Sequence, residues 1–133
     1  LLSLIGIRSF EPGEAQLLED KNVAVHFSKD VQKFGLLKLL EQHIADFQAQ
    51  NIPFGISLDL DGLDPSHIDA LGTPEKDGLD LEPILHVFEN MNLDNFIGLE
   101  ITEYNPRLDN DKQRGLGVIE RIIDSITCRF KKA

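Results

Sequence analysis

The stretch FGISLDLDGLDP, residues 54–65, decides the fold, because within it an apolar run is followed directly by an acidic turn. Its first half, Phe54 to Asp59, has the length and apolar content of a buried strand. Glycine, aspartate and proline are frequent from there to about Gly78, which predicts a long loop. In an open α/β sheet, ligands bind outside the carboxyl ends of the strands. The acidic residues after this strand are therefore the first candidates for a functional site.

Three more apolar runs predict strands, at residues 1–7, 22–27 and 96–101. Four helices are predicted. The first covers residues 11–20, and the second begins at an N-cap at Ser28 and ends near residue 50. The third begins after an N-cap at Asp80, and the fourth lies near the carboxyl end of the chain. The order βαβαβαβα, with near-continuous apolar strands, predicts an α/β fold with a mainly parallel sheet covered by helices on both faces, a three-layer α/β/α arrangement.

For two of the predicted helices, the spacing of apolar residues predicts which side chains form the apolar face. The helix that begins after Ser28 is expected to run unbroken to Asn51, with an apolar face formed by Leu36, Leu37, Leu40, Ile44 and Phe47. The last helix is expected to place on one side Ile119, Ile122, Ile123, Ile126 and Phe130.

Composition excludes several classes of partner. The chain has 133 residues, 23 Asp and Glu against 13 Lys and Arg, and a formal net charge of −10. Nucleic acid is not expected as a partner, because there is no basic stripe to release counterions from a phosphate backbone. No apolar run approaches the ~20 residues of a membrane-spanning helix, so no membrane partner is expected. The single cysteine, Cys128, excludes an internal disulfide; a buried cysteine and a cytoplasmic location are expected.

Two aspartates at the end of the third strand suggest a cation site. Asp59 and Asp61 are two residues apart, so their side chains share one face if the strand continues through both. Carboxylates this close repel unless a cation lies between them, and hard oxygen ligands suit Mg²⁺, Ca²⁺ or Mn²⁺. The alternative is that both are turn residues. An EF-hand loop fits poorly, because its sixth position would be Asp64 and its twelfth Ala70.

The end of the fourth strand also carries carboxylates. Glu100 and Glu103 are three residues apart and point to opposite faces of an extended strand, so only one of them shares a site with the aspartates. Glu103 lies nearer the carboxyl end, where its carboxylate could accept two hydrogen bonds from a guanidinium group. The alternative is a solvated glutamate at a strand end. The tetrapeptide DGLD occurs twice, at residues 61–64 and 77–80, and its different flanks suggest coincidence.

The segment SLDLDGLDPSHIDALGTP, residues 57–74, followed by LEITEYNP, residues 99–106, resembles the ureohydrolase family of arginases and agmatinases, in particular its C-terminal half. The opening IGIRSFEPGE, residues 5–14, is similar to the arginase segment that precedes this half. The resemblance implies hydrolysis of a guanidino group to urea and an amine, with two Mn²⁺ ions per active site. It also implies that Asp59 and Asp61 are metal ligands, that Glu103 binds the guanidinium group, and that Thr73 is a minor substrate contact.

Two metal motifs of the family are absent from the sequence. Neither a Gly-Gly-Asp-His element nor an Asp-Ala-His-x-Asp element occurs, and the only methionine is Met91, so residue 1 is not an initiator. We therefore expect residues 1–133 to be the C-terminal portion of one ureohydrolase domain whose N-terminal half is absent, and to be inactive alone. His67, in the loop after the third strand, is expected to be solvated rather than to support the site.

The expected reaction of the parent protein is the conversion of L-arginine to L-ornithine and urea. Asn105, within the element resembling Glu-x-Asn-Pro, and the opening segment favour arginase over agmatinase. Agmatinase, guanidinobutyrase and formimidoylglutamase activities remain open, as does a non-catalytic scaffold domain. The expected partners are a small guanidino substrate and further copies of the protein, since the family forms trimers or hexamers.

Overall fold

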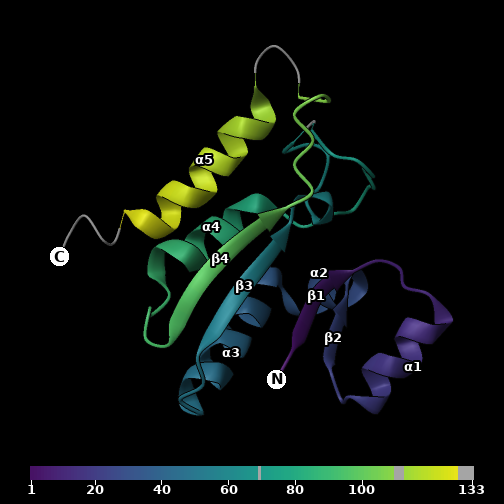
Figure 1. Cartoon of the computed structure of the whole chain (residues 1–133), viewed down its shortest axis with the longest axis vertical. Coiled ribbons are helices and arrows are strands. Elements are labelled where there is room, and N and C mark those ends of the chain that lie inside the picture. Colours follow the sequence, from purple (N-terminus) through teal and green to yellow (C-terminus); the bar gives the residue numbers. More distant parts are fainter. Residues whose placement is uncertain (69, 110–112, 129–133) are drawn as a thin grey trace.

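The computed structural model describes residues 1–68, 70–109 and 113–128. Strands and helices follow one another along the chain in the expected order, except that two helices instead of one lie between the second and third strands (Figure 1). None of the helices in these three ranges is long and apolar enough to cross a membrane. The strands are β1 (Ser3–Ile7), β2 (Ala24–Phe27), β3 (Phe54–Asp59) and β4 (Phe96–Thr102). The α-helices are α1 (Pro12–Asp20), α2 (Ser28–Phe34), α3 (Leu36–Ala49), α4 (Leu81–Asn90) and α5 (Arg114–Thr127).

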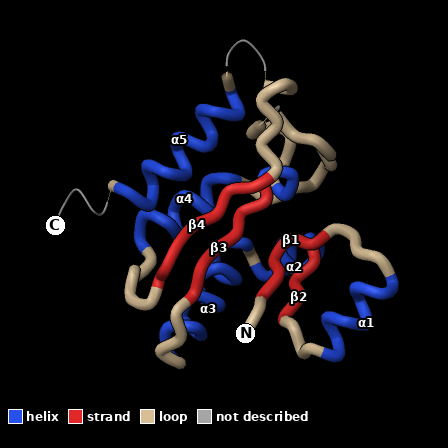
Figure 2. Tube along the Cα trace, in the orientation of Figure 1, coloured by secondary structure: helices blue, strands red, loops and turns tan. Residues whose placement is uncertain are grey.

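The four strands form two separate parallel pairs rather than one continuous sheet (Figure 2). β1 pairs with β2, and β3 pairs with β4 in a register that aligns Asp59 with Thr102. The parallel direction agrees with the sequence-based prediction. The division into two pairs was not predicted, because apolar content marks a strand but carries no information about which strand lies beside it.

The helix predicted from Ser28 to about residue 50 is in fact two helices, and this expectation was wrong. Gly35 separates α2 from α3 with a φ of +87°, a conformation that glycine adopts at little cost and that ends a right-handed helix. Ser28 is the first residue of α2, and Phe27 is its N-cap. The apolar spacing from Val31 to Phe47 continues across the break, which is why periodicity alone did not reveal it.

The main core lies between the β3–β4 pair and three helices. Within the described ranges, α4 contacts both α3 and α5, and its residues Leu81, Ile84 and Phe88 are almost completely buried. Asp80 caps α4 as predicted, since its side chain accepts a hydrogen bond from the amide of Glu82. Along β3, burial alternates, with Phe54 and Leu58 inside. The opposite face of this pair is exposed, most clearly at Ile97 of β4, which is 74% exposed.

Helix α5 buries a narrower stripe than its sequence predicted. Val118, Ile122 and Ile126 are buried, and Ile119 packs against the core. Ile123, expected on the same side, is 45% exposed, because a stripe with a spacing of four residues faces the core and a residue one position further turns away from it. Phe130, also expected there, lies outside the described residues.

A polar chain of three side chains joins β1, β2 and α3. The hydroxyl of Ser3 lies 3.0 Å from Nδ1 of His43, and Nε2 of His43 lies 2.7 Å from Nε2 of His26. Burial of the His43 ring and the nearby His26 ring both lower the pKa of His43, and Asp46 opposes them. A hydrogen bond between two imidazole rings needs an unprotonated nitrogen on one of them, so the two rings cannot both be protonated while this contact is formed.

We predict that the chain loses stability as the pH falls below 6.5. Folded His43 has a pKa below its ordinary value of 6.5, so the unfolded chain binds the proton more tightly. The stabilisation is fully present above pH 6.5 and is lost as the pH falls through the lowered pKa. Thermal unfolding midpoints between pH 5 and 8 measure this effect. His43→Gln should flatten that part of the profile, and an unchanged profile would contradict the prediction.

Candidate metal and substrate site

The two aspartates of the candidate site lie at the end of β3 in different local structures. β3 ends at Asp59, and Asp61 belongs to a short 3₁₀ helix, Leu60–Gly62. The condition for a shared face, a strand that continues through both residues, is therefore not met, and the alternative of a turn describes this segment. The reason is local: Oδ1 of Asp59 accepts a hydrogen bond from the amide of Asp61 at 2.8 Å, and this turn ends the extended backbone.

The carboxylate of Asp61 closes the loop that follows. Its Oδ1 accepts a hydrogen bond from the amide of Gly72 at 3.0 Å, and its Oδ2 accepts one from the amide of Thr73 at 3.0 Å. The hydroxyl of Thr73 also donates to Oδ2. Thr73, expected as a minor substrate contact, therefore lies against an expected metal ligand and orients it.

Glu103 lies at the same edge of the sheet as Asp59. The register of β3 and β4 aligns Asp59 with Thr102, and Glu103 is the next residue along the chain. Its side chain is exposed and its φ is +62°, a conformation that costs an L-residue free energy and that is concentrated at functional sites. Glu100 does not share this edge, because within β4 it accepts a hydrogen bond from the hydroxyl of Ser57 at 2.7 Å.

The described residues provide carboxylate ligands but not a complete metal centre. No group of three or more His, Cys, Asp or Glu side chains within residues 1–68, 70–109 and 113–128 is arranged to hold an ion. A carboxylate has about four lone-pair positions, so the three hydrogen bonds to Asp61 leave room on it for a cation. Asp59 and Asp61 therefore fit a hard cation in donor chemistry, while the number of ligands is too small for a closed site.

Arg8 is a residue of the site region that sequence analysis missed. It follows β1 directly, and its guanidinium group donates to the carbonyl of Asp61 and, at 2.8 Å, to the carbonyl of Glu75. These bonds tie the carboxyl end of β1 to the loop after β3. A charged residue immediately after an apolar strand was the available signal, but its partners are more than fifty residues away in the sequence.

The two DGLD segments, treated above as a coincidence, pair with each other. Leu63 and Leu79 form a parallel β-bridge, in which the amide of Asp64 donates to the carbonyl of Leu79 and the amide of Leu79 donates to the carbonyl of Gly62. Gly78 lies so close to the first segment that a Cβ atom there would come within 2.4 Å of the backbone of Leu63. The pairing fixes both ends of the long loop.

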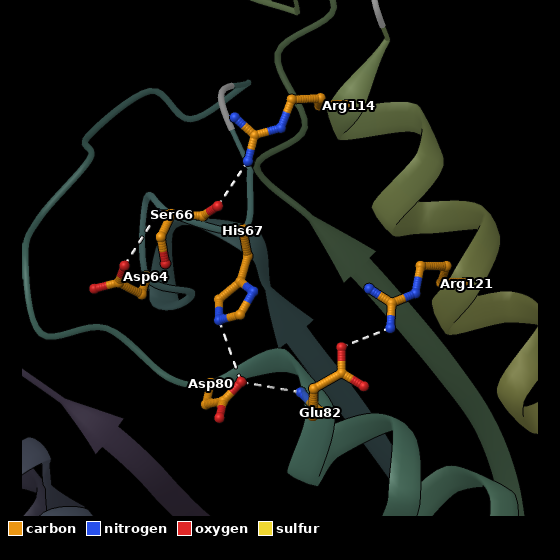
Figure 3. Close-up of polar contacts among 7 residues, drawn as sticks. All are labelled: Asp64, Ser66, His67, Asp80, Glu82, Arg114 and Arg121. Carbon is orange, nitrogen blue, oxygen red and sulfur yellow. Dashed lines mark hydrogen bonds and ion pairs between the residues drawn. The ribbon is translucent and has the colours of Figure 1, made fainter.

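Polar contacts connect this loop to α4 and α5 (Figure 3). Nε2 of His67 lies 3.2 Å from Oδ1 of Asp80, and with a side chain 26% exposed His67 is held in place rather than freely solvated. Arg114 at the start of α5 donates to the carbonyl of Ser66 at 2.6 Å. Hydrogen bonds from the side chain and the backbone of Ser66 lower the pKa of Asp64, which keeps this loop carboxylate charged.

The segment after β4 is fastened in the same region. The amide of Asn105 donates to the carbonyl of Ala70 at 3.1 Å, which joins the loop after β4 to the loop after β3. The hydroxyl of Tyr104 donates to Asp109 at 2.9 Å, and this bond raises the pKa of Tyr104. Asp109 also accepts hydrogen bonds from two amides at the start of α5, Gly115 and Leu116.

Comparisons with known proteins agree with this architecture. A model of the arginase family matches residues 2–128. The arginase of Bacillus caldovelox is 34% identical over 107 residues, which make up 80% of this chain and 36% of that protein. Its solved structure superposes with a TM-score of 0.79 and 31% identity, covering 93% of this chain and 42% of that chain. The agmatine ureohydrolase of Thermoplasma volcanium superposes with a TM-score of 0.72 and 28% identity, covering 98% and 44%.

The chain superposes on these enzymes and carries carboxylates at the carboxyl end of its β3–β4 pair, which places it in the ureohydrolase class of proteins. Because the family model matches residues 2–128, the chain belongs to the arginase family. The expected resemblance and the expected α/β fold class are thereby confirmed. The chain spans 36% of the length of the Bacillus caldovelox arginase that it matches.

We predict that Gly78→Ala destabilises the chain by about 2 kcal/mol or more, because the added methyl group would overlap the backbone of Leu63 and Asp64 and force the two DGLD segments apart. Gly62 occupies the matching position of the first segment and has no atom within 4 Å of its Cβ position. Gly62→Ala is therefore the control and should change the stability by less than about 0.5 kcal/mol. Urea unfolding measures both. Equal effects of the two variants would contradict a tight approach at Gly78.

We predict that Glu103→Gly raises the free energy of unfolding by about 1 kcal/mol, because glycine adopts a φ of +62° without the steric cost that glutamate bears. Glu100→Gly, within regular β4, is the matched control and should lower stability by about 0.5–1 kcal/mol. Chemical denaturation of both variants provides the comparison. A loss of stability in Glu103→Gly equal to that in Glu100→Gly would show that Glu103 bears no backbone strain.

Proposed function

We propose that the protein to which this chain belongs hydrolyses a guanidino compound, with L-arginine converted to L-ornithine and urea as the reaction. One observation supports this more than any other: the register of β3 and β4 puts Asp59 and Glu103 at one sheet edge, beside the loop that Asp61 closes. Family membership over residues 2–128 gives this arrangement its chemical context.

Glu103 is proposed to bind the guanidinium group of the substrate. A carboxylate accepts two parallel hydrogen bonds from a planar guanidinium, and this pair fixes both the position and the plane of the group. Fixing the plane defines the face from which water approaches the trigonal carbon, and such orientation accounts for a large part of enzymatic rate enhancement. The strained backbone of Glu103 supports this role, because such strain is concentrated at functional sites, where it fixes the position from which a side chain starts.

Asp59 and Asp61 are proposed to contribute ligands to Mn²⁺, in agreement with their oxygen chemistry. Manganese, when bound, supplies the Lewis-acid chemistry that activates water for hydrolysis. Thr73 and Gly72 hold the Asp61 carboxylate in one orientation through their hydrogen bonds. Since two carboxylates do not complete a site, the proposal requires further ligands from outside the described residues, and the chain alone should be inactive.

The choice of arginine as substrate rests on the likeness to arginases and on two sequence features, Asn105 and the opening segment around Arg8. Homo-oligomerisation, a cytoplasmic location and the absence of nucleic-acid and membrane partners remain proposals from the sequence.

The decisive assay supplies Mn²⁺ and compares the longest protein that contains this sequence on L-arginine, agmatine and formiminoglutamate. Release of urea from arginine well above turnover of the other two is expected. Glu103→Gln should lower kcat/KM by at least about 100-fold, because it removes a charged hydrogen-bond acceptor from the guanidinium group, while leaving bound manganese unchanged. Preference for another substrate would replace arginase by that activity. Failure on all three, with manganese bound, would favour a scaffold.

The purified 133-residue chain provides the complementary test. With Mn²⁺ added, it is expected to release no urea from arginine, because its described residues do not form a complete metal centre. Catalysis by this chain alone would show that the ligand set is already sufficient and would contradict the proposal for additional ligands.

A further inference from the structure

We propose that His26 and His43 form a binding site for a divalent transition metal ion of the kind that imidazole ligands favour, such as Zn²⁺ or Cu²⁺. The bound ion would join β2, which carries His26, to α3, which carries His43. The site shares no residue with the candidate metal and substrate site at the carboxyl end of β3. The proposal therefore does not depend on the hydrolysis proposed above.

The two imidazole rings approach each other through nitrogen atoms that can bind a metal. Nε2 of His26 lies 2.7 Å from Nε2 of His43, and the ring centroids are 4.9 Å apart with the ring planes inclined at 60°. The rings therefore meet at their edges and do not stack. Two nitrogens that bind one Zn²⁺ at about 2.0–2.1 Å in tetrahedral geometry lie about 3.3 Å apart. Each ring would need to move by only roughly 0.3 Å to admit the ion.

Ser3 of β1 orients the ring of His43. Its hydroxyl oxygen lies 3.0 Å from Nδ1 of His43, the nitrogen that does not face His26. When Nδ1 carries the proton and donates to this oxygen, Nε2 has a free lone pair, which is the form of imidazole that binds a metal. Histidine ligands in metal sites have such a partner at their second nitrogen, and this hydrogen bond fixes both the tautomer and the orientation of the ring.

The protonation state of the pair is suited to an ion. Burial of the His43 ring and the nearby His26 ring lower the pKa of His43, so this ring is uncharged at neutral pH although Asp46 opposes the shift. Without a metal, the proton on Nε2 of His26 lies between the two rings. When the ion takes its place, exchange with water moves this proton to Nδ1 of the same ring. Two neutral imidazoles thus bind the ion without a net release of protons.

The surroundings give the pair a fixed spacing and leave it open to solvent. α3 packs against β1, and β1 is hydrogen-bonded to β2, so both histidines start from regular elements and not from loops. Both side chains are partly exposed, so an ion can reach them. No third His, Cys, Asp or Glu in the described part of the chain completes the set, and water would fill the other positions. Mn²⁺, which prefers carboxylate oxygens, should bind here far more weakly than Zn²⁺.

Nitrogen NMR spectra of the imidazole rings, recorded while Zn²⁺ is added to the unmodified chain, test the proposal. The measurement is made at about pH 7.5, above the ordinary pKa of an imidazole. The Nε2 signals of His26 and His43 are expected to shift together and to stop changing at one bound ion per chain. The signals of the other two histidines, His67 and His86, should change little. Equal shifts of all four, or no shift of His26 and His43, would overturn the proposal.

Three glutamine variants distinguish a metal site from a pair that is only hydrogen-bonded. Glutamine keeps an amide that can bond to the remaining histidine but supplies no imidazole ligand. His26→Gln and His43→Gln should each weaken Zn²⁺ binding by about tenfold or more. His86→Gln is the control, because His86 is exposed on α4, and it should bind Zn²⁺ as the unmodified chain does.

Thermal unfolding of the same variants tests the connection between β2 and α3. Zn²⁺ should raise the unfolding midpoint of the unmodified chain and of His86→Gln, because an ion that binds the folded state stabilises it. The midpoints of His26→Gln and His43→Gln should not respond to Zn²⁺. Equal zinc affinity in all three variants, or equal responses of their midpoints, would show adventitious binding elsewhere and would overturn the assignment.

Discussion

The hydrogen bonds of Asp61 are the constraint on which the site depends. Its carboxylate accepts bonds from Gly72 and Thr73, and its carbonyl accepts one from Arg8. One residue thus joins the end of β3, the return of the long loop and the end of β1. Three hydrogen-bond donors stabilise the negative charge of the Asp61 carboxylate, and the same three bonds hold the loop against the end of β3. A bound cation would interact with that same charge. The same hydrogen bonds therefore order the loop and orient the carboxylate that is proposed as a metal ligand.

Local chemistry explains which parts of the fold were predictable. β3 and the Asp80 cap of α4 were located correctly, because an apolar run and a capping side chain act over a few residues. The break at Gly35 was missed, since apolar residues continue at helical spacing on both sides of it. The division of the sheet into two pairs was also missed. Strand neighbours are chosen by tertiary packing, which a single sequence does not display.

Sequence analysis anticipated where the candidate site residues lie in the fold better than how they are arranged, and their roles stay predictions. Asp59, Asp61, Thr73 and Glu103 lie at the carboxyl end of the β3–β4 pair, where acidic strand ends and the family resemblance placed them. The turn at Asp59 was one of two alternatives that the sequence left open, because the same residue types serve both as metal ligands and in turns. The contacts of Arg8 and the pairing of the two DGLD segments connect distant residues, and nothing in local sequence reports such partners.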